Sequence, residues 1–323
     1  MPYNSLTSRT DSAALIPEDA SRDILADLAN TGYIMSLARR LPDMPRAQRR
    51  LPVLSSLPTA YFVSGDTGLK QTTETAWSNV YVDAEELAVI VPIPQAVLDD
   101  ADYDIWAEIR PLLVDAFNIA ITQAVLYGTN IPASWTTNLG AAGIIALCAA
   151  RSATASLAAF ADVYEAVLGE SSAGAADGVL ALLEADGYGA TGHLAHIGFR
   201  SQLRNQRTTE GLPIFNANPG GKAPYLLDGV DCYFPMDGSL SSTYKLISGQ
   251  WDQLVYAMRQ DITYSVSTEA TIQDASGAVV YNLFQQDMVA LRAVMRLGFA
   301  LPNPINRMQE TAASRCPFAY LSA

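Results

Sequence analysis

The sequence is poor in cysteine, in charge and in long hydrophobic runs, and each shortage excludes a class of protein. Only three of its 323 residues are cysteine, Cys148, Cys232 and Cys316. An odd number of cysteines so far apart argues against a disulfide framework and fits folding in a reducing cytoplasm. Because the chain has no apolar run of about 18 residues and no apolar signal core at its start, we expect no membrane span and no secretion.

Basic residues are also few, with 20 Lys and Arg against 33 Asp and Glu, for a net charge of −13. This balance does not favour a nucleic-acid-binding protein, which needs clustered cations to hold phosphates. Acidity serves solubility, and it would equally keep an enclosed DNA mobile by repulsion. Only 16% of the residues are charged, which is typical of subunits covered by neighbours and also of many enzymes.

No recognisable catalytic, cofactor or metal motif occurs. His193 and His196 lie in a β-like run, where residues three apart face opposite sides, so a metal site is disfavoured against a structural role. Gly220-Gly-Lys222 lacks the flanking residues of a phosphate loop. We therefore expect no cofactor, no metal and no enzyme activity.

The stretch from Met44 to Val91 alternates β-type runs with proline and glycine. The runs are 51–54, 60–63 and 80–82, and the polar middle from Ser64 to Ser78 is rich in threonine. The pattern predicts two long antiparallel strands joined by a flexible tip. An isolated two-stranded ribbon is marginal in water, so we expect another copy of the chain to shelter it.

A strand is expected at 87–94, followed by an acidic cluster from Asp99 to Asp104. Acidic side chains favour the positive end of a helix, and helical spacing of apolar residues continues to Tyr127, where Gly128 should end the helix. Pro111 should bend this helix. The cluster includes Asp99, Asp100 and Asp102, for which capping is favoured over cation binding.

The rest of the chain predicts mixed, shorter elements. Helices are expected at 17–41, at 160–184 with a break at 169–178, and at 198–204; strands are expected at 191–197, 230–234 and 244–248. We expect 128–156 to be a connection and the tail from Pro302 to be loose. Apolar spacing over 286–301 is compatible with a helix.

One basic cluster interrupts the acidic sequence, formed by Arg39, Arg40, Arg46, Arg49 and Arg50. It could contact nucleic acid, but in so acidic a chain we favour pairing with an acidic surface, such as Asp99–Asp104 of another subunit.

Four groups of segments together resemble the Hong Kong 97 type of phage major capsid protein, in order and spacing, over about residues 15–310. The segments are Thr31–Arg40 with Leu51–Leu54; Thr59–Val63, Trp77–Val80 and Leu87–Pro94; Val97–Asp100 through Gln123–Gly128 with Ile131–Pro132; and Phe284–Gly298.

The resemblance implies an α+β fold of that capsid type. It implies an N-terminal arm (1–17), a peripheral domain with its first helix at 18–44, an extended β-hairpin loop (45–88), a long spine helix within 89–135, an axial domain (136–280), and a return strand with a C-terminal tail (281–323). On this reading 286–301 is a strand beside the spine, not a helix.

The resemblance also implies a function. Copies would self-assemble as pentamers and hexamers into an icosahedral shell around phage double-stranded DNA, built in the host cytoplasm and found in the virion capsid. Separate scaffolding, portal and decoration proteins are expected partners, without sequence-specific DNA binding. The candidate interface residues are Arg46, Arg49, Arg50, Tyr61, Phe62, Lys70, Trp77, Asp99, Asp100 and Asp102.

Some members of the family cross-link a loop lysine to a peripheral asparagine. Lys70 is the lysine in this loop, with Asn303 or Asn306 and Glu310 as possible partners; we expect no cross-link. The alternatives are an encapsulin compartment that holds enzyme cargo, a soluble α/β enzyme with no recognisable motif, and a smaller phage decoration or tail component. Particle contents, oligomeric size and electron microscopy distinguish them.

Overall fold

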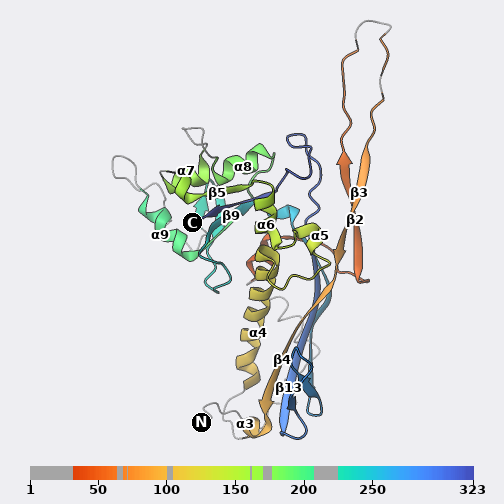
Figure 1. The fold of residues 1–323 in the computed structure, drawn as a ribbon, viewed down its shortest axis with the longest axis vertical. Helices are drawn as coiled ribbons and strands as arrows, with labels where there is room; N and C mark the ends of the chain where they lie inside the picture. Colours follow the sequence, from red (N-terminus) through yellow and green to blue (C-terminus); the bar gives the residue numbers. More distant parts are fainter. Residues whose placement is uncertain are drawn as a thin grey trace.

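The computed structural model describes residues 32–63, 68–70, 72–99, 105–160, 162–169, 177–206 and 225–323. It combines a tall lower body, a compact upper sheet covered by helices, and a ribbon that projects beyond both (Figure 1). Helices and strands are mixed along the chain, which confirms the α+β class. The expected N-terminal arm lies outside the described residues.

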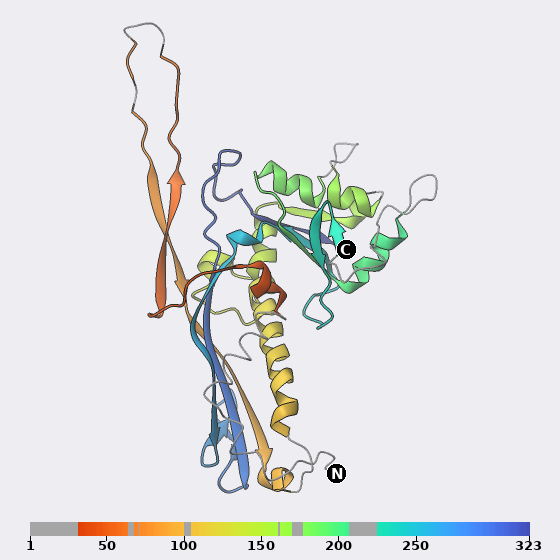
Figure 2. The ribbon, with the colours of Figure 1, turned by 180° about the vertical axis from the view of Figure 1, so that it is seen from behind.

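The lower body is a four-stranded sheet in the order β1-β10-β13-β4, with a long helix beside it (Figure 2). The helix α4 (Ile105–Thr122) continues as a π-helical turn, η1 (Gln123–Tyr127), and ends at Gly128, whose φ is +68°. Its buried side chains share one core with those of β13. The spine helix and its stop at Gly128 are therefore confirmed, and Pro111 lies inside α4.

The sheet strands and the small elements of this half are as follows. They are α2 (Tyr33–Leu37), β1 (Arg39–Arg40), β4 (Glu85–Pro94), α3 (Gln95–Asp99), η3 (Trp251–Gln253), β10 (Val255–Ser267), the hairpin β11 (Thr271–Gln273) and β12 (Val279–Asn282), and β13 (Met288–Ala300).

The upper part is a six-stranded sheet in the order β5-β14-β9-β6-β8-β7. Its elements are α5 (Thr136–Leu139), α6 (Gly143–Ala150), β5 (Thr154–Ser156), η2 (Leu157–Ala159), α7 (Val163–Leu168), α8 (Val179–Ala185), β6 (Gly192–Ala195), α9 (Ile197–Asn205), β7 (Tyr225–Leu227), β8 (Val230–Tyr233), β9 (Tyr244–Gly249) and β14 (Phe318–Ser322). The helices α6 and α8 contact β14.

Five expectations for the shorter elements are confirmed. The two helices on either side of the break at 169–178 are α7 and α8, and β6 is buried at all four residues. The helix expected at 198–204 is α9, and the strands expected at 230–234 and 244–248 are β8 and β9.

The helix reading of 286–301 is wrong, and the strand implied by the resemblance is correct. The strand β13 has neighbours on both sides, β10 and β4, and most of its residues are buried. A central strand covered on both faces loses the alternation of apolar and polar residues, so its sequence does not reveal its period.

The tail from Pro302 is not loose. Its last strand, β14, lies inside the upper sheet, parallel to β5 and antiparallel to β9. Phe318, Ala319 and Leu321 are fully buried there. A short strand gains its stability from partners on both sides, which a local reading of polar flanking residues does not detect.

Three further expectations need correction. The described part of the first helix ends at Leu37 rather than near Leu41, because the following backbone extends: Arg39 N donates to Leu254 O and Leu41 N to Tyr256 O. The β-type run 60–63 is not a strand, since ribbon pairing ends at Ser56 and Ala76. The connection 128–156 contains α5, α6 and β5.

Candidate assembly interface

The ribbon consists of β2 (Gln48–Ser56) and β3 (Ala76–Asp83), paired antiparallel as expected. Directly opposed residues of an antiparallel pair share a face. One face therefore carries the pairs Arg49–Val82, Leu51–Val80 and Val53–Ser78. The other carries Arg50–Tyr81, Pro52–Asn79 and Leu54–Trp77. The two faces have different surroundings.

The first face packs on the same chain near the base of the ribbon. Val53 and Val82 are buried, and Val82 belongs to a small core with Met44, Val255 and Ala300. The β3 backbone is held from the body, because Trp135 Nε1 donates to Asp83 O at 2.8 Å and Asn138 Nδ2 donates to Tyr81 O at 2.8 Å.

A second set of contacts holds β2 and the residues after it. Ile305 N donates to Leu54 O at 3.2 Å, and Arg307 Nη2 donates to Pro58 O at 2.9 Å. The base of the ribbon is thus packed against other parts of its own chain. The expectation that another copy shelters all of 45–88 was too broad; for the second face and for the described residues after Pro58 it stays a prediction.

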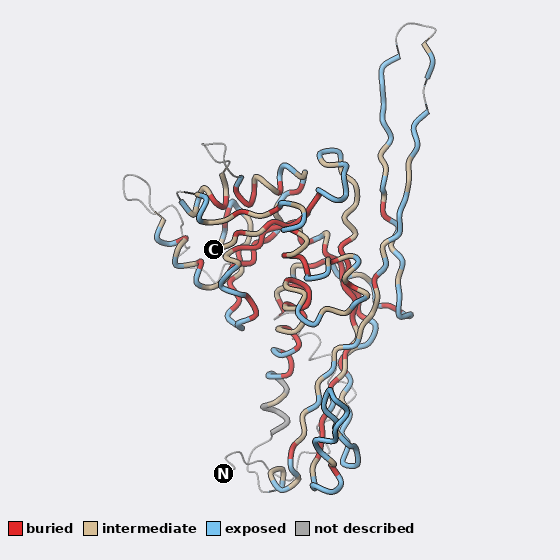
Figure 3. Tube along the Cα trace, in the orientation of Figure 1, coloured by how far each residue is buried: buried red, intermediate tan, exposed pale blue. Residues whose placement is uncertain are grey.

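Most residues of the second face are exposed, and so are most of the described residues in the part of the ribbon that projects beyond the body (Figure 3). Trp77 is 68% exposed and Phe62 fully so, and Leu69 is 90% exposed. Tyr61 and Tyr81 are also exposed. Large apolar side chains gathered on one projecting element are typical of an interaction site rather than of scattered surface residues.

The five arginines of the basic cluster have different environments, and Arg39 is exposed in β1. Arg40 forms an ion pair with Asp43 at 3.1 Å. Arg49 donates to the backbone oxygens of Pro42 and Asp43, so it braces the turn before β2. Arg46 and Arg50 are exposed, and no ion pair to either occurs within the described ranges. Arg50 lies on the exposed face, opposite Tyr81.

The acidic candidates lie elsewhere. Asp99 ends α3 at the bottom of the molecule, away from β2 and β3 (Figure 1). It accepts a hydrogen bond from Gln95 Nε2 at 3.2 Å. Asp100 and Asp102 lie outside the described residues. The fold does not bring Asp99 to the arginines of its own chain, so any pairing between them would join two copies.

The residues considered for cross-linking are placed as follows. Lys70 is exposed near the top of the ribbon. Asn303 Oδ1 accepts from Tyr188 Oη and Arg315 Nε, and Asn306 Nδ2 donates to Asp186 O at 2.7 Å. Both amides therefore hold the loop before β14, and the absence of a cross-link stays a prediction.

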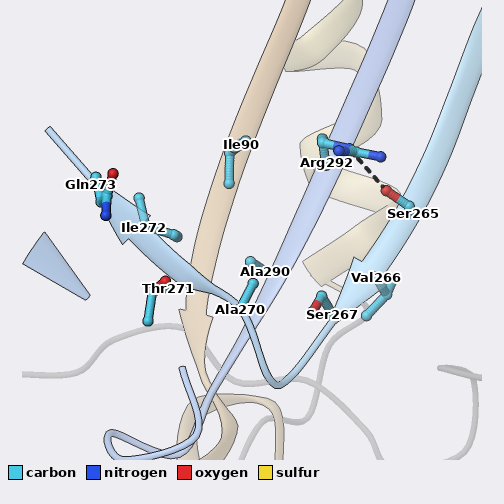
Figure 4. Close-up of a pocket in the computed structure, with 10 residues that line it drawn as sticks. All are labelled: Ile90, Ser265, Val266, Ser267, Ala270, Thr271, Ile272, Gln273, Ala290 and Arg292. Atoms are coloured by element: carbon cyan, nitrogen blue, oxygen red, sulfur yellow. Dashed lines mark hydrogen bonds between the residues drawn. The ribbon is translucent and has the colours of Figure 1, made fainter. Parts of the chain in front are cut away.

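Sequence reasoning missed a second exposed apolar region at the lower end of the body. The strand β11 of the β11–β12 hairpin lies beside the ends of β4, β10 and β13 (Figure 4). Between them is a groove of about 590 Å³, lined in part by Ile90, Val266 and Ile272. Val279, Val280 and Phe284 are exposed beside it. In the sequence, the signal was the placement of these three apolar residues in a short stretch after Gly277.

The remaining chemical candidates have structural roles. His193 is buried, with Nδ1 at 2.8 Å from Ser248 Oγ, and burial lowers its pKa to about 4. His196 caps α9 by accepting from Gly198 N. Lys222 lies outside the described residues. Among the described residues no cluster of metal-ligating side chains occurs, and no helix is long and apolar enough to cross a membrane.

Comparison with known proteins gives one consistent result. The model of the Phage capsid family matches residues 12–306. The major capsid protein of Staphylococcus phage 80alpha is 28% identical over 282 residues, which cover 85% of this chain and 78% of that protein.

Solved structures agree with the sequence match. A chain from Microbacterium phage Oxtober96 superposes with a TM-score of 0.74 at 25% identity, covering 95% of this chain and 99% of that one. A chain from Mycobacterium phage Bobi gives 0.70 at 27% identity, covering 98% of each.

Proposed function

Because the chain belongs to the phage capsid family and is a major capsid protein of the shell rather than an enzyme, we propose that its copies join through the exposed face of the ribbon. The contact would run from one copy to its neighbour within rings of five and six. The observation that carries this proposal is the unequal burial of the two ribbon faces.

Burial energetics favour this contact. Trp77, Phe62 and Leu69 together expose far more apolar surface than a lone side chain, and aromatic anchors dominate the energy of protein interfaces. Since each subunit would offer one ribbon and receive another, weak contacts would be multiplied around a ring and across the closed shell.

Charge would set the register of the contact. Arg50 stands beside Tyr81 on the exposed face, and Arg46 lies just before β2. An acidic surface on the neighbour, such as the one that begins at Asp99, would neutralise them. Ion pairs at the edge of an interface contribute more to orientation and association rate than to affinity.

The division into domains can be proposed from the two sheets. The strands β4, β10 and β13 would form the core of the peripheral domain, and the six-stranded sheet with β14 would form the axial domain. In this division β10 belongs to the peripheral domain, although it lies within the expected axial range 136–280. The strand β14 belongs to the axial domain, although it lies within the expected C-terminal segment 281–323. The axial domain would surround the five- and six-fold axes.

We further propose that the shell is assembled in the host cytoplasm and encloses double-stranded DNA, with separate scaffolding, portal and decoration proteins. The net charge of −13 supports a lining that does not bind DNA tightly. Electron microscopy and nucleic-acid content of purified particles test this, and protein cargo in place of DNA would contradict it.

Truncating the aromatic anchors tests the ribbon contact. Trp77→Ala and Phe62→Ala should leave the subunit folded, because neither side chain is buried in its own chain. Each should lower the yield of shells roughly tenfold or more, as loss of an interface anchor does. Sedimentation and electron microscopy measure the yield.

Tyr164→Ala is the matched control. Tyr164 is an exposed aromatic residue on α7, away from the ribbon, so its loss should leave the shell yield near that of the parent. Normal assembly of both ribbon variants would contradict the proposal.

A further inference from the structure

Two cysteines that are far apart in the chain meet in the core of the upper part. Cys148 lies in α6, and Cys316 lies two residues before β14. Their sulfur atoms are 3.5 Å apart, and both side chains are buried. The third cysteine, Cys232, lies in β8 and is also buried, but no hydrogen bond or sulfur contact of its thiol occurs in the described part of the chain.

The backbone on each side holds the two thiols in place. Cys148 Sγ lies 3.3 Å from Phe318 O, and Cys316 N donates to Asp186 Oδ2 at 2.8 Å. Arg151, one turn after Cys148, donates to Arg315 O at 2.6 Å. Two of these contacts join α6 and its C-cap to the chain around the start of β14, and the third joins the end of α8 to Cys316.

The two thiols are not equivalent. Burial raises the pKa of Cys148 well above its ordinary value. The hydrogen bond from the Cys148 thiol lowers the pKa of Cys316. Cys316 is thus the thiol that more readily provides the thiolate nucleophile, and Cys148 is placed to attack whatever forms on it.

We propose that Cys148 and Cys316 form a redox modification site, at which a small hydroperoxide converts the two thiols into a disulfide between α6 and the chain leading into β14. The proposed disulfide rests on the short distance between the two sulfur atoms. Its timing, after the particle leaves a reducing cytoplasm, rests on the proposed function.

The chemistry balances with hydrogen peroxide as the oxidant. The Cys316 thiolate attacks one peroxide oxygen, the O–O bond breaks, and hydroxide leaves and takes up the thiol proton as water. Cys148 Sγ then attacks the resulting sulfenic acid, the S–O bond breaks, and a second water carries the proton of Cys148. Two thiols and one peroxide give one disulfide and two waters.

Formation of the bond requires a small movement. A disulfide has sulfur atoms about 2.05 Å apart, so the pair must close by about 1.5 Å. Cys316 lies near the end of a segment without regular secondary structure, 301–317, so no helix or strand hydrogen bonds have to break for its sulfur to approach Cys148. Peroxide is small and uncharged, so a brief local opening admits it.

The link would secure the last strand of the chain. β14 carries the core residues Phe318 and Leu321 and lies between β5 and β9. A covalent bond just before it, to a residue 168 positions earlier, would prevent β14 from leaving the sheet independently.

Thiol counting on purified shells tests the proposal. Shells prepared with reductant are freed of it, treated with hydrogen peroxide, quenched, denatured and alkylated. We expect alkylatable cysteines to fall from the three in the sequence to one, Cys232, with a peptide pair linked through Cys148 and Cys316 in the mass spectrum. Amide exchange in β14 should slow roughly tenfold or more and recover with reductant.

The variants separate the possible outcomes. After peroxide treatment, Cys232→Ser should still lose both of its remaining thiols to the disulfide. Cys148→Ser should form no disulfide, and its Cys316 should accumulate oxygen as sulfenic or higher acids. Three free thiols after treatment, or oxygen added to Cys316 of the parent without a link, would overturn the proposal. The same count on dissociated subunits does not depend on shell formation, so a failure there is distinct from a failure of the proposed function.

Discussion

His193 illustrates how one buried residue can make the subunit sensitive to pH. Burial lowers its pKa to about 4, opposed by the backbone of Leu227 and the carboxylate of Asp228. The unfolded chain takes up a proton near pH 6.5, whereas the folded chain does so only near pH 4. The unfolded state therefore binds more protons in this window, and the free energy of unfolding falls as the pH falls.

We expect His193→Asn to remove this pH dependence. The parent should lose up to about 3 kcal/mol of unfolding free energy between pH 6.5 and pH 4, and the variant should lose less, whatever its stability at neutral pH. Urea unfolding followed over this range measures the slope.

His196→Asn is the matched control, because asparagine also caps helices and His196 caps α9. It should keep the slope of the parent. Equal slopes for the parent and His193→Asn would show that the histidine does not titrate in this way.

Arg49 and Arg50 are adjacent and should respond differently to charge reversal. Arg50→Glu should leave the subunit stable and lower assembly, with a smaller effect at high salt, since its side chain is exposed on the outer face. Arg49→Glu should destabilise the subunit, because Arg49 holds the turn at Pro42 and Asp43.

Thermal unfolding measures the stability of the Arg49→Glu and Arg50→Glu subunits, and light scattering measures their assembly. If Arg50→Glu assembles normally and its particles retain less DNA, Arg50 contacts nucleic acid and the interface assignment is wrong.

At the scale of elements, the ribbon base depends on a close approach of two backbones. A Cβ atom added at Gly298 in β13 would lie 2.5 Å from Asp83 O, at the end of β3. Gly298→Ala should therefore push β3 away from the body and cost about 1–3 kcal/mol of unfolding free energy.

Chemical denaturation of the subunit measures this cost. Gly189→Ala is the control, since a Cβ there meets nothing within 4 Å. If both variants have the stability of the parent, the contact between β3 and β13 yields easily and does not fix the ribbon.

Much of the fold could be predicted from local patterns, and the two misread strands share one cause. The ribbon, the strand before α3 and the spine helix all show their period or their stop signal in the sequence. The strand β13 was misread as a helix and β14 as a loose tail because both are interior strands, with partners on each side. Their stability comes from distant residues, which no local window contains.

The candidate interface was predictable to a smaller extent. The alternation of the ribbon gives two faces, but only the tertiary contacts of Val53, Val82 and Arg49 decide which face its own chain covers. Likewise, nothing in the spacing of Cys148 and Cys316 indicates that their sulfur atoms meet.

For the whole molecule, we predict that the upper part of the ribbon serves assembly and contributes little to the stability of the subunit. Its upper part has few contacts with the body above the hydrogen bond from Arg307 to Pro58. Replacing 59–75 with a two-residue turn should therefore leave the melting temperature of the subunit within a few degrees of the parent and prevent shell formation.

Calorimetry and electron microscopy measure the two effects. The parent subunit, dissociated from shells, is the reference for the melting temperature. A shortened chain that still closes into shells would mean that assembly depends on other surfaces, such as the groove beside β11 and β12.

The position of β14 has a consequence for synthesis. The six-stranded sheet is completed by residues 318–322, which the ribosome adds after the other five strands, and Ala323 N donates to Thr243 O. While these residues remain in the exit tunnel, β5 and β9 have no strand between them. Only a chain translated through residue 322 can complete this sheet, so we expect products that terminate before β14 to lack the strand that joins β5 to β9.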